Sequence, residues 1–165
     1  MEAGHEAPTG ESQARRLEVV AERLTELLRR PEAARFLRAA PGENEWSSAQ
    51  VLGHTVEMIP YWMGHCEAMI AAGEPPHTFG RTFDAPERVA GIGRFASGNP
   101  EEVLQALNGA VRAAAGRIRG MSEEERRRKG VYTKGGEFTV AEVIERFLVA
   151  HAEDHLAQVR AALGA

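Results

Sequence analysis

Four segments of this chain repeat apolar residues at three- and four-residue steps, with charged residues between them. Such spacing places the apolar side chains on one face of an α-helix, and that face has to be buried against other elements. No segment shows a convincing strand pattern. The sequence therefore predicts an all-α fold, an antiparallel four-helix bundle with short extra helices in the connections. The four stripes are Leu17, Val20, Leu24, Leu27 and Leu28; Val51, Leu52, Thr55, Met58, Ile59, Trp62 and Met69; Val103, Leu107, Ala110, Val111, Ala114 and Ile118; and Val140, Val143, Ile144, Phe147, Leu148, Leu156, Val159 and Leu163.

Polar residues that cap helices mark where three of these helices begin. Ser47 with Gln50, and Thr139 with Glu142, have the spacing of a capping box, in which each side chain bonds the backbone N–H of the other residue. Asn99 precedes a proline and two glutamates, a composition typical of a first helical turn. These residues predict helices that begin close to positions 47, 99 and 139.

Proline and glycine interrupt the helical pattern. Pro60 lies inside the second helical segment and has no N–H to donate, so we expect a kink or a break there. The proline-rich segment 73–82 predicts a loop, and Asp84 predicts the start of a short helix that runs toward Phe95. Three glycines in segment 130–136 predict a mobile connection into the last helix.

The length of 165 residues and the hydrophobic content of 43% fit one folded domain. We assign this domain to residues 11–165, after a flexible leader at residues 1–10. The net charge of −4 argues against a nucleic-acid partner, and the basic run 126–129 is interpreted as a solvated turn because no aromatic residue interleaves it. Neither a long apolar stretch nor a signal-peptide pattern occurs, so we expect no membrane partner and a cytoplasmic location.

Cys66 is the only cysteine, so no intramolecular disulfide can form. It directly follows His65, but neighbouring residues on a helix point about 100° apart and do not face each other. A Cys–His nucleophile is therefore disfavoured, and we interpret Cys66 as a buried, unreactive thiol.

His151 and His155 lie four residues apart on the last helix. This spacing puts both side chains on one face with their Cβ atoms ~5–6 Å apart, close enough to share a metal ion. Both continue the apolar stripe, where a buried imidazole needs a polar partner. Asp154 and Gln158, each three residues further on, could accept hydrogen bonds from the two imidazoles. The alternative is a pair of core histidines that bind no metal.

A third imidazole, His54, lies in the second helix, with Glu57 three residues later. If the second helix packs beside the last one, three imidazoles can meet on one ion and leave a coordination position open, as in catalytic zinc sites. His65 lies about 16 Å further along the helix and cannot share that ion, so we interpret it as a packing or surface residue. His5 and His77 are interpreted as bystanders.

Two segments of the chain closely resemble the DinB/YfiT-like superfamily. They are Trp46-Ser47 followed by Val51-Leu52-Gly53-His54, and the stretch from His151 to Gln158, His-Ala-Glu-Asp-His-Leu-Ala-Gln. The resemblance covers roughly residues 17–163 and is specific in these two segments. Members of the superfamily are four-helix bundles in which three histidines bind a divalent metal. The resemblance thus implies His54, His151 and His155 as the ligands of one divalent ion per chain, with zinc or nickel expected first, and it implies a homodimer.

The resemblance also implies a class of function. Some relatives are similar to thiol S-transferases that use bacillithiol, mycothiol or glutathione, or to mycothiol-dependent maleylpyruvate isomerase, and others are grouped as metal-dependent hydrolases. We therefore expect a metal-dependent enzyme that activates a low-molecular-weight thiol or water against a small-molecule substrate, with assistance from Glu57. The alternatives are a metal-dependent hydrolase, a non-catalytic metal- or ligand-binding bundle, and a structural module whose histidines belong to the core.

Overall fold

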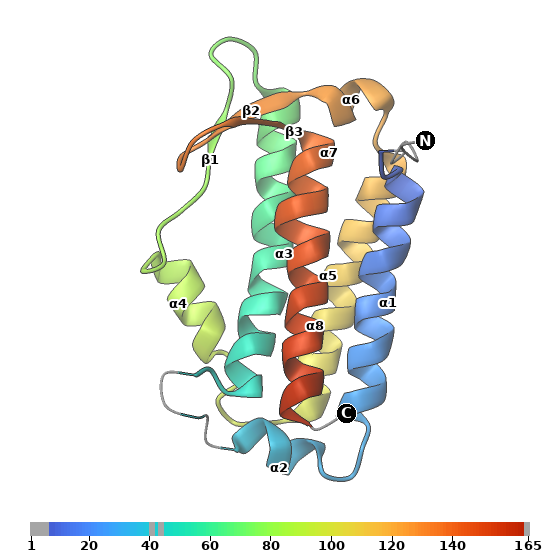
Figure 1. Cartoon of the computed structure of the whole chain (residues 1–165), viewed down its shortest axis with the longest axis vertical. Helices are drawn as coiled ribbons and strands as arrows, with labels where there is room; N and C mark the ends of the chain where they lie inside the picture. The colour runs from blue at the N-terminus through green and yellow to red at the C-terminus, as the bar shows by residue number, and fades with distance from the viewer. Residues whose placement is uncertain (1–6, 40–41, 43–44, 164–165) are drawn as a thin grey trace, which may run out of the picture.

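The computed structural model describes residues 7–39, 42 and 45–163. Its four long helical segments form a bundle (Figure 1), which confirms the predicted all-α four-helix bundle. Their bounds are α1 Gly10–Leu28, α3 Ser48–Ala71, α5 Pro100–Gly120, and a last segment made of α7 Val140–Val143, the π-helical turn η1 Ile144–Val149 and α8 Ala150–Ala162. The short helices in the connections are α2 Ala33–Arg38, α4 Pro86–Gly93 and α6 Glu123–Arg127. None of the described helices is long and apolar enough to cross a membrane.

The order of the helices around the bundle differs from their order in the chain. Both α1 and α3 pack against α5 and α8, so α1 and α3 occupy opposite corners. In Figure 1, α1 and α8 run downward and α3 and α5 run upward. The contacts α1/α5 and α3/α8 are therefore antiparallel, whereas α3/α5 and α1/α8 are parallel, because the long connection 72–99 returns the chain to the lower end. This arrangement puts the second and the last long helix side by side.

The capping residues are where the sequence places them. The Ser47 hydroxyl accepts from the Gln50 backbone N–H at 3.2 Å, and the Gln50 side chain accepts from the Ser47 N–H at 2.8 Å. Thr139 and Glu142 form the second capping box, and Asn99 caps α5 through the Glu101 N–H. These bonds satisfy N–H groups that have no partner within the helix, which confirms the three predicted helix starts.

Pro60 does not break α3, which continues as an α-helix to Ala71. Of the two expected outcomes the break is therefore wrong, and the kink stays a prediction. Pro60 lies on an exposed side of the helix, and local adjustment of the backbone can accommodate a proline inside a helix.

A small sheet covers the upper end of the bundle (Figure 1), where the sequence predicted a loop and a mobile connection. Its strands are β1 Thr78–Phe79, β2 Lys129–Tyr132 and β3 Glu137–Thr139, with β1 parallel and β3 antiparallel to β2. Strands this short carry no period that reasoning from sequence can detect, and β1 pairs across some fifty residues of chain. Gly135 and Gly136 have φ values of 108° and 101°, which permit the tight turn between β2 and β3.

Three smaller predictions need correction at the helix ends. Asp84 does not cap α4; its carboxylate accepts from the Thr82 hydroxyl, and Ala85 is the N-cap. The basic run is not fully solvated, because Arg126 is buried and donates to the Gln13 side chain and to the Pro8 carbonyl. Helix α1 begins at Gly10, inside the predicted leader, and residues 1–6 of that leader lie outside the described residues.

Candidate metal centre

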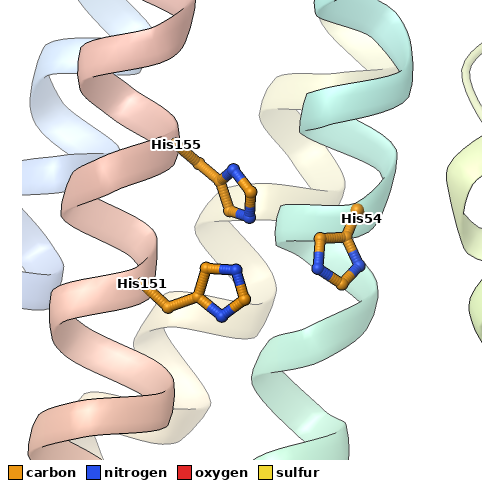
Figure 2. Close-up of side chains that lie close together, drawn as sticks. All are labelled: His54, His151 and His155. Carbon is orange, nitrogen blue, oxygen red and sulfur yellow. The ribbon is translucent and has the colours of Figure 1, made fainter. Parts of the chain in front are cut away.

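The structure brings the three candidate histidines together between α3 and α8. Figure 2 shows the rings of His54, His151 and His155 turned toward one another. Each ring offers a nitrogen, and the three nitrogens lie within 4.8 Å of one another. The ring centroids of His54 lie 5.5 Å from His151 and 5.2 Å from His155. The packing of α3 beside α8, on which the three-histidine hypothesis depends, is thus present.

The π-helical turn Ile144–Val149 sets the direction in which His151 and His155 point. An extra residue in a helical turn rotates everything after it by about 100°. After this turn, Ala152 takes the fully buried position, while the two histidines are half-buried and face α3. The expectation that the histidines continue the buried stripe is corrected, because both lie at its edge and are only half-buried.

His54 is buried and is held from behind by a carboxylate. Its Nδ1 lies 3.4 Å from Oε2 of Glu57, and it has no hydrogen-bond partner among the described residues. Arg81 donates from both terminal nitrogens to the Glu57 carboxylate, at 2.7 Å for the Nη2–Oε2 bond. Burial raises the pKa of the Glu57 carboxyl group, but the proximity of His54 and the hydrogen bonds from Arg81 outweigh burial and lower that pKa. A charged carboxylate at Nδ1 leaves Nε2 of His54 free to bind an ion.

His155 is oriented by Gln158, as the spacing predicts. Its Nδ1 lies 3.2 Å from the Gln158 amide oxygen, and since that oxygen can only accept, Nδ1 donates and Nε2 carries the lone pair. This Nε2 is buried and has no hydrogen-bond partner among the described residues. A buried nitrogen without a partner destabilises a fold unless something binds it. Asp154, in contrast, is exposed and reaches His151 only through its charge.

The surroundings keep the two histidines of α8 neutral. Burial lowers the pKa of His151, and the proximity of His54 adds to the effect. Burial also lowers the pKa of His155, to about 4, with further lowering from His151 and from the charge of Arg88. Neutral imidazoles are the form that binds metal ions, so these two histidines are in their metal-binding form at neutral pH.

A cavity of about 230 Å³ opens onto the three histidines. Its walls are mainly aromatic, with Trp62 stacked on Phe147 at 4.9 Å between ring centroids. No carboxylate lines it among the described residues, since Glu57 lies behind His54. Reasoning from the sequence missed the cationic lining residues, because short helices and hairpins give no periodic signal for them. The other lining residues are Trp46, Arg81, Thr82, Phe83, Arg88, Tyr132 and Lys134.

His65 and His77 are not among the residues that line this cavity. His65 and His77 bond each other, with 2.8 Å between Nδ1 and Nε2, so His65 is a packing residue as expected and His77 has a partner that the sequence did not reveal. His5 lies outside the described residues.

Comparison with known families identifies the fold. The family model of the DinB superfamily matches residues 11–159, which is most of the chain. The chain belongs to the DinB superfamily. Both segments that carried the resemblance lie within the matched range. No curated protein matches this DinB chain significantly.

Two solved structures share the DinB bundle. The crystal structure of the mycothiol-dependent maleylpyruvate isomerase superposes with a TM-score of 0.70 at 13% identity, over 96% of this chain and 63% of the isomerase. The chain thus spans less than two thirds of that protein. YfiT from Bacillus subtilis, described as a probable metal-dependent hydrolase with an unusual four-helix bundle topology, gives a TM-score of 0.69 at 13% identity, over 97% of this chain and 92% of YfiT. At this identity the two structures establish the fold of the DinB chain and nothing beyond it.

Proposed function

We propose that the chain binds one divalent metal ion through His54, His151 and His155 and activates a low-molecular-weight thiol there, as a thiol S-transferase does. The observation that carries this proposal is the convergence of three imidazoles at the wall of an aromatic cavity that contains no carboxylate among the described residues. Three imidazoles leave a coordination position open, and they suit zinc, nickel, copper or iron.

The residues fit a bound ion in two further respects. His155 directs a buried, unpartnered Nε2 into the site, and its opposite nitrogen is fixed by Gln158. His54 has the Glu57 carboxylate behind it, the arrangement by which proteins orient a metal-binding imidazole. In this proposal Glu57 assists by holding His54, and Arg81 keeps Glu57 ionised.

The absence of a lining carboxylate favours a thiol over water. A bound divalent ion supplies positive charge that deprotonates a thiol outright and lowers the pKa of water. A thiolate then needs no further base, whereas hydrolysis is helped by a positioned group that moves a proton to the leaving group. The described lining offers aromatic rings and cations, and the sole cysteine, Cys66, is fully buried elsewhere. The thiol therefore comes from a small molecule.

Turnover of 1-chloro-2,4-dinitrobenzene tests this proposal. Zinc- or nickel-loaded protein is assayed with bacillithiol, mycothiol or glutathione, and we expect turnover that needs the metal and one of the thiols together. The rate should persist below the free thiol pKa of ~8.5, because the ion favours the thiolate. His151→Ala should abolish the rate, and His77→Ala, which changes a histidine outside the cavity, should not.

A metal-dependent hydrolase is the second candidate, favoured by the fold shared with YfiT. It would hydrolyse an ester such as 4-nitrophenyl acetate with the same metal requirement and no thiol requirement. That result would replace the thiol proposal. Metal-loaded protein that turns over neither substrate would instead support a non-catalytic binding bundle, and protein that retains no metal would support core histidines. The predicted homodimer stays a prediction that light scattering can test.

A further inference from the structure

Two of the cations that line the cavity contact Phe83. The guanidinium of Arg88, from α4, lies 5.1 Å from the centre of the Phe83 ring, and Nζ of Lys134, from the β2–β3 turn, lies 4.4 Å from it. Arg88 also donates to the Phe83 carbonyl at 2.8 Å and lies 5.3 Å from the Trp46 ring. Phe83 itself is 73% exposed. The Phe83 ring thus contacts both cations at the cavity.

Neither cation has an acidic partner in the described part of the chain. Arg81, the third cation of the lining, is paired with Glu57 and Glu87, whereas no ion pair joins Arg88 or Lys134 to a carboxylate. Bonding to one carbonyl and lying over aromatic rings leaves most of the N–H groups of Arg88 without an acceptor. A divalent ion on the histidines would add to the same positive field. The cavity is therefore suited to an anion, with which these donors form charge-assisted hydrogen bonds.

We propose that Arg88 and Lys134 bind a carboxylate of the small thiol, so that the cavity selects thiols that carry a carboxylate away from the sulfur. The binding of the sulfur at the histidines rests on the proposed function. The binding of the carboxylate rests on the two cations. Trp62 and Phe147, stacked on each other in the same lining, offer apolar contact to the rest of such a thiol.

Isothermal calorimetry on zinc-loaded protein tests the selection with two probes that share a thiol and differ by one charge, 3-mercaptopropanoate and 3-mercaptopropanamide. We expect the carboxylate to bind at least about tenfold more tightly, the size of one or two charge-assisted hydrogen bonds. In the double variant Arg88→Gln/Lys134→Gln this preference should fall to about twofold or less, while the Kd of the amide stays unchanged. An unchanged Kd for the amide also shows that the variant is folded.

The matched control is the double variant Arg94→Gln/Lys129→Gln, which also removes one arginine and one lysine charge, but from positions outside the cavity. Arg94 is the C-cap of α4, and Lys129 pairs with Glu137 on the hairpin. This control should keep the full preference for the carboxylate. Equal Kd values for the two probes in the wild type would overturn the proposal. A preference that survives in Arg88→Gln/Lys134→Gln would come from chelation of the zinc and would overturn it as well.

A third probe separates this inference from the proposed function. Benzoate carries no thiol, and we titrate it into metal-free protein to test the carboxylate end alone. If neither thiol binds, the thiol proposal fails. Benzoate binding that is lost in Arg88→Gln/Lys134→Gln would then still support the carboxylate site, and its absence would overturn that site too.

Discussion

Gly53 in α3 lies directly against the backbone carbonyl of Gly91 in α4: a Cβ built on Gly53 would lie 2.3 Å from that oxygen. Gly91 in turn has no room for a Cβ, which would lie 2.5 Å from the side chain of Glu57. This close approach positions α4, and with it Arg88, next to the turn of α3 that carries His54.

We expect Gly53→Ala to lower the free energy of unfolding by ~1–3 kcal/mol, because α4 must move to admit the methyl group. Gly64→Ala in the same helix is the control. A Cβ at position 64 would meet nothing within 4 Å. Gly64→Ala should therefore raise the free energy of unfolding by about 0.5–1 kcal/mol, because alanine lowers the conformational entropy of the unfolded chain. Urea unfolding of both variants measures these changes in stability. A Gly53→Ala variant that is more stable than the wild type would contradict the close packing of α3 against α4.

Removal of any one imidazole should remove the metal. His54→Ala, His151→Ala and His155→Ala each leave two ligands, so we expect metal content to fall from about one ion per chain to a small fraction of that. His77→Ala serves as the control because His77 bonds His65 away from the cavity. Elemental analysis of protein purified without added metal provides the measurement. Full occupancy in His151→Ala would refute the ligand set.

The residues behind the ligands should tune the metal affinity without abolishing it. Glu57→Gln and Gln158→Ala remove a charge behind His54 and an acceptor behind His155, and each should weaken metal binding ~10–100-fold. We expect a smaller effect from Asp154→Ala on the same helix, because that carboxylate is exposed and bonds no imidazole in the described structure. Competition against a chelator of known affinity measures the metal affinity of each variant. If Asp154→Ala weakens metal binding as much as Gln158→Ala does, the Asp154 carboxylate lies closer to the site than the structure places it.

Metal-free protein should lose stability in mild acid. The pKa of His155 is lowered by burial from 6.5 to about 4, so below pH 6.5 the unfolded chain binds a proton that the folded chain does not. The part of the free energy of unfolding that depends on a neutral His155 is fully present above pH 6.5 and is lost as the pH falls toward 4. Its upper limit is about 3 kcal/mol, and we expect a smaller value because the ring is only half-buried.

The comparison with His155→Gln isolates this contribution, since glutamine stays neutral throughout. Urea midpoints measured between pH 7 and pH 4 should fall more steeply for the wild type than for the variant. Identical pH dependences would show that the folded state does not hold His155 neutral.

Cys66 should stay unreactive while the chain is folded. It is fully buried, and burial raises the pKa of its thiol to about 12, so almost no thiolate is present at pH 8. A coloured disulfide reagent at pH 8 should label it slowly in native protein and at once in urea. Rapid native labelling would contradict the assigned burial and would make Cys66 a candidate nucleophile.

The sequence by itself determined those structural features that depend only on residues close together in the chain. The capping boxes at Ser47 and Thr139, the start of α5 at Asn99 and the apolar stripes follow from side chains within a few positions of each other, and all are present in the structure. The i, i+4 spacing that puts His151 and His155 on one face is local in the same sense. The match of the chain to the DinB superfamily also needed only sequence.

Tertiary structure alone decided the features that join distant segments. The order of the helices around the bundle places His54 beside α8, and the helical periods of the sequence do not specify that order. The π-helical turn rotates His151 and His155 to the edge of the core, and the pairing of β1 with β2 converts predicted loops into a sheet. Arg88 and Lys134 meet at Phe83 because a short helix and a hairpin are folded onto the same cavity. Such contacts form between segments far apart in the chain, and local propensity carries no information about them.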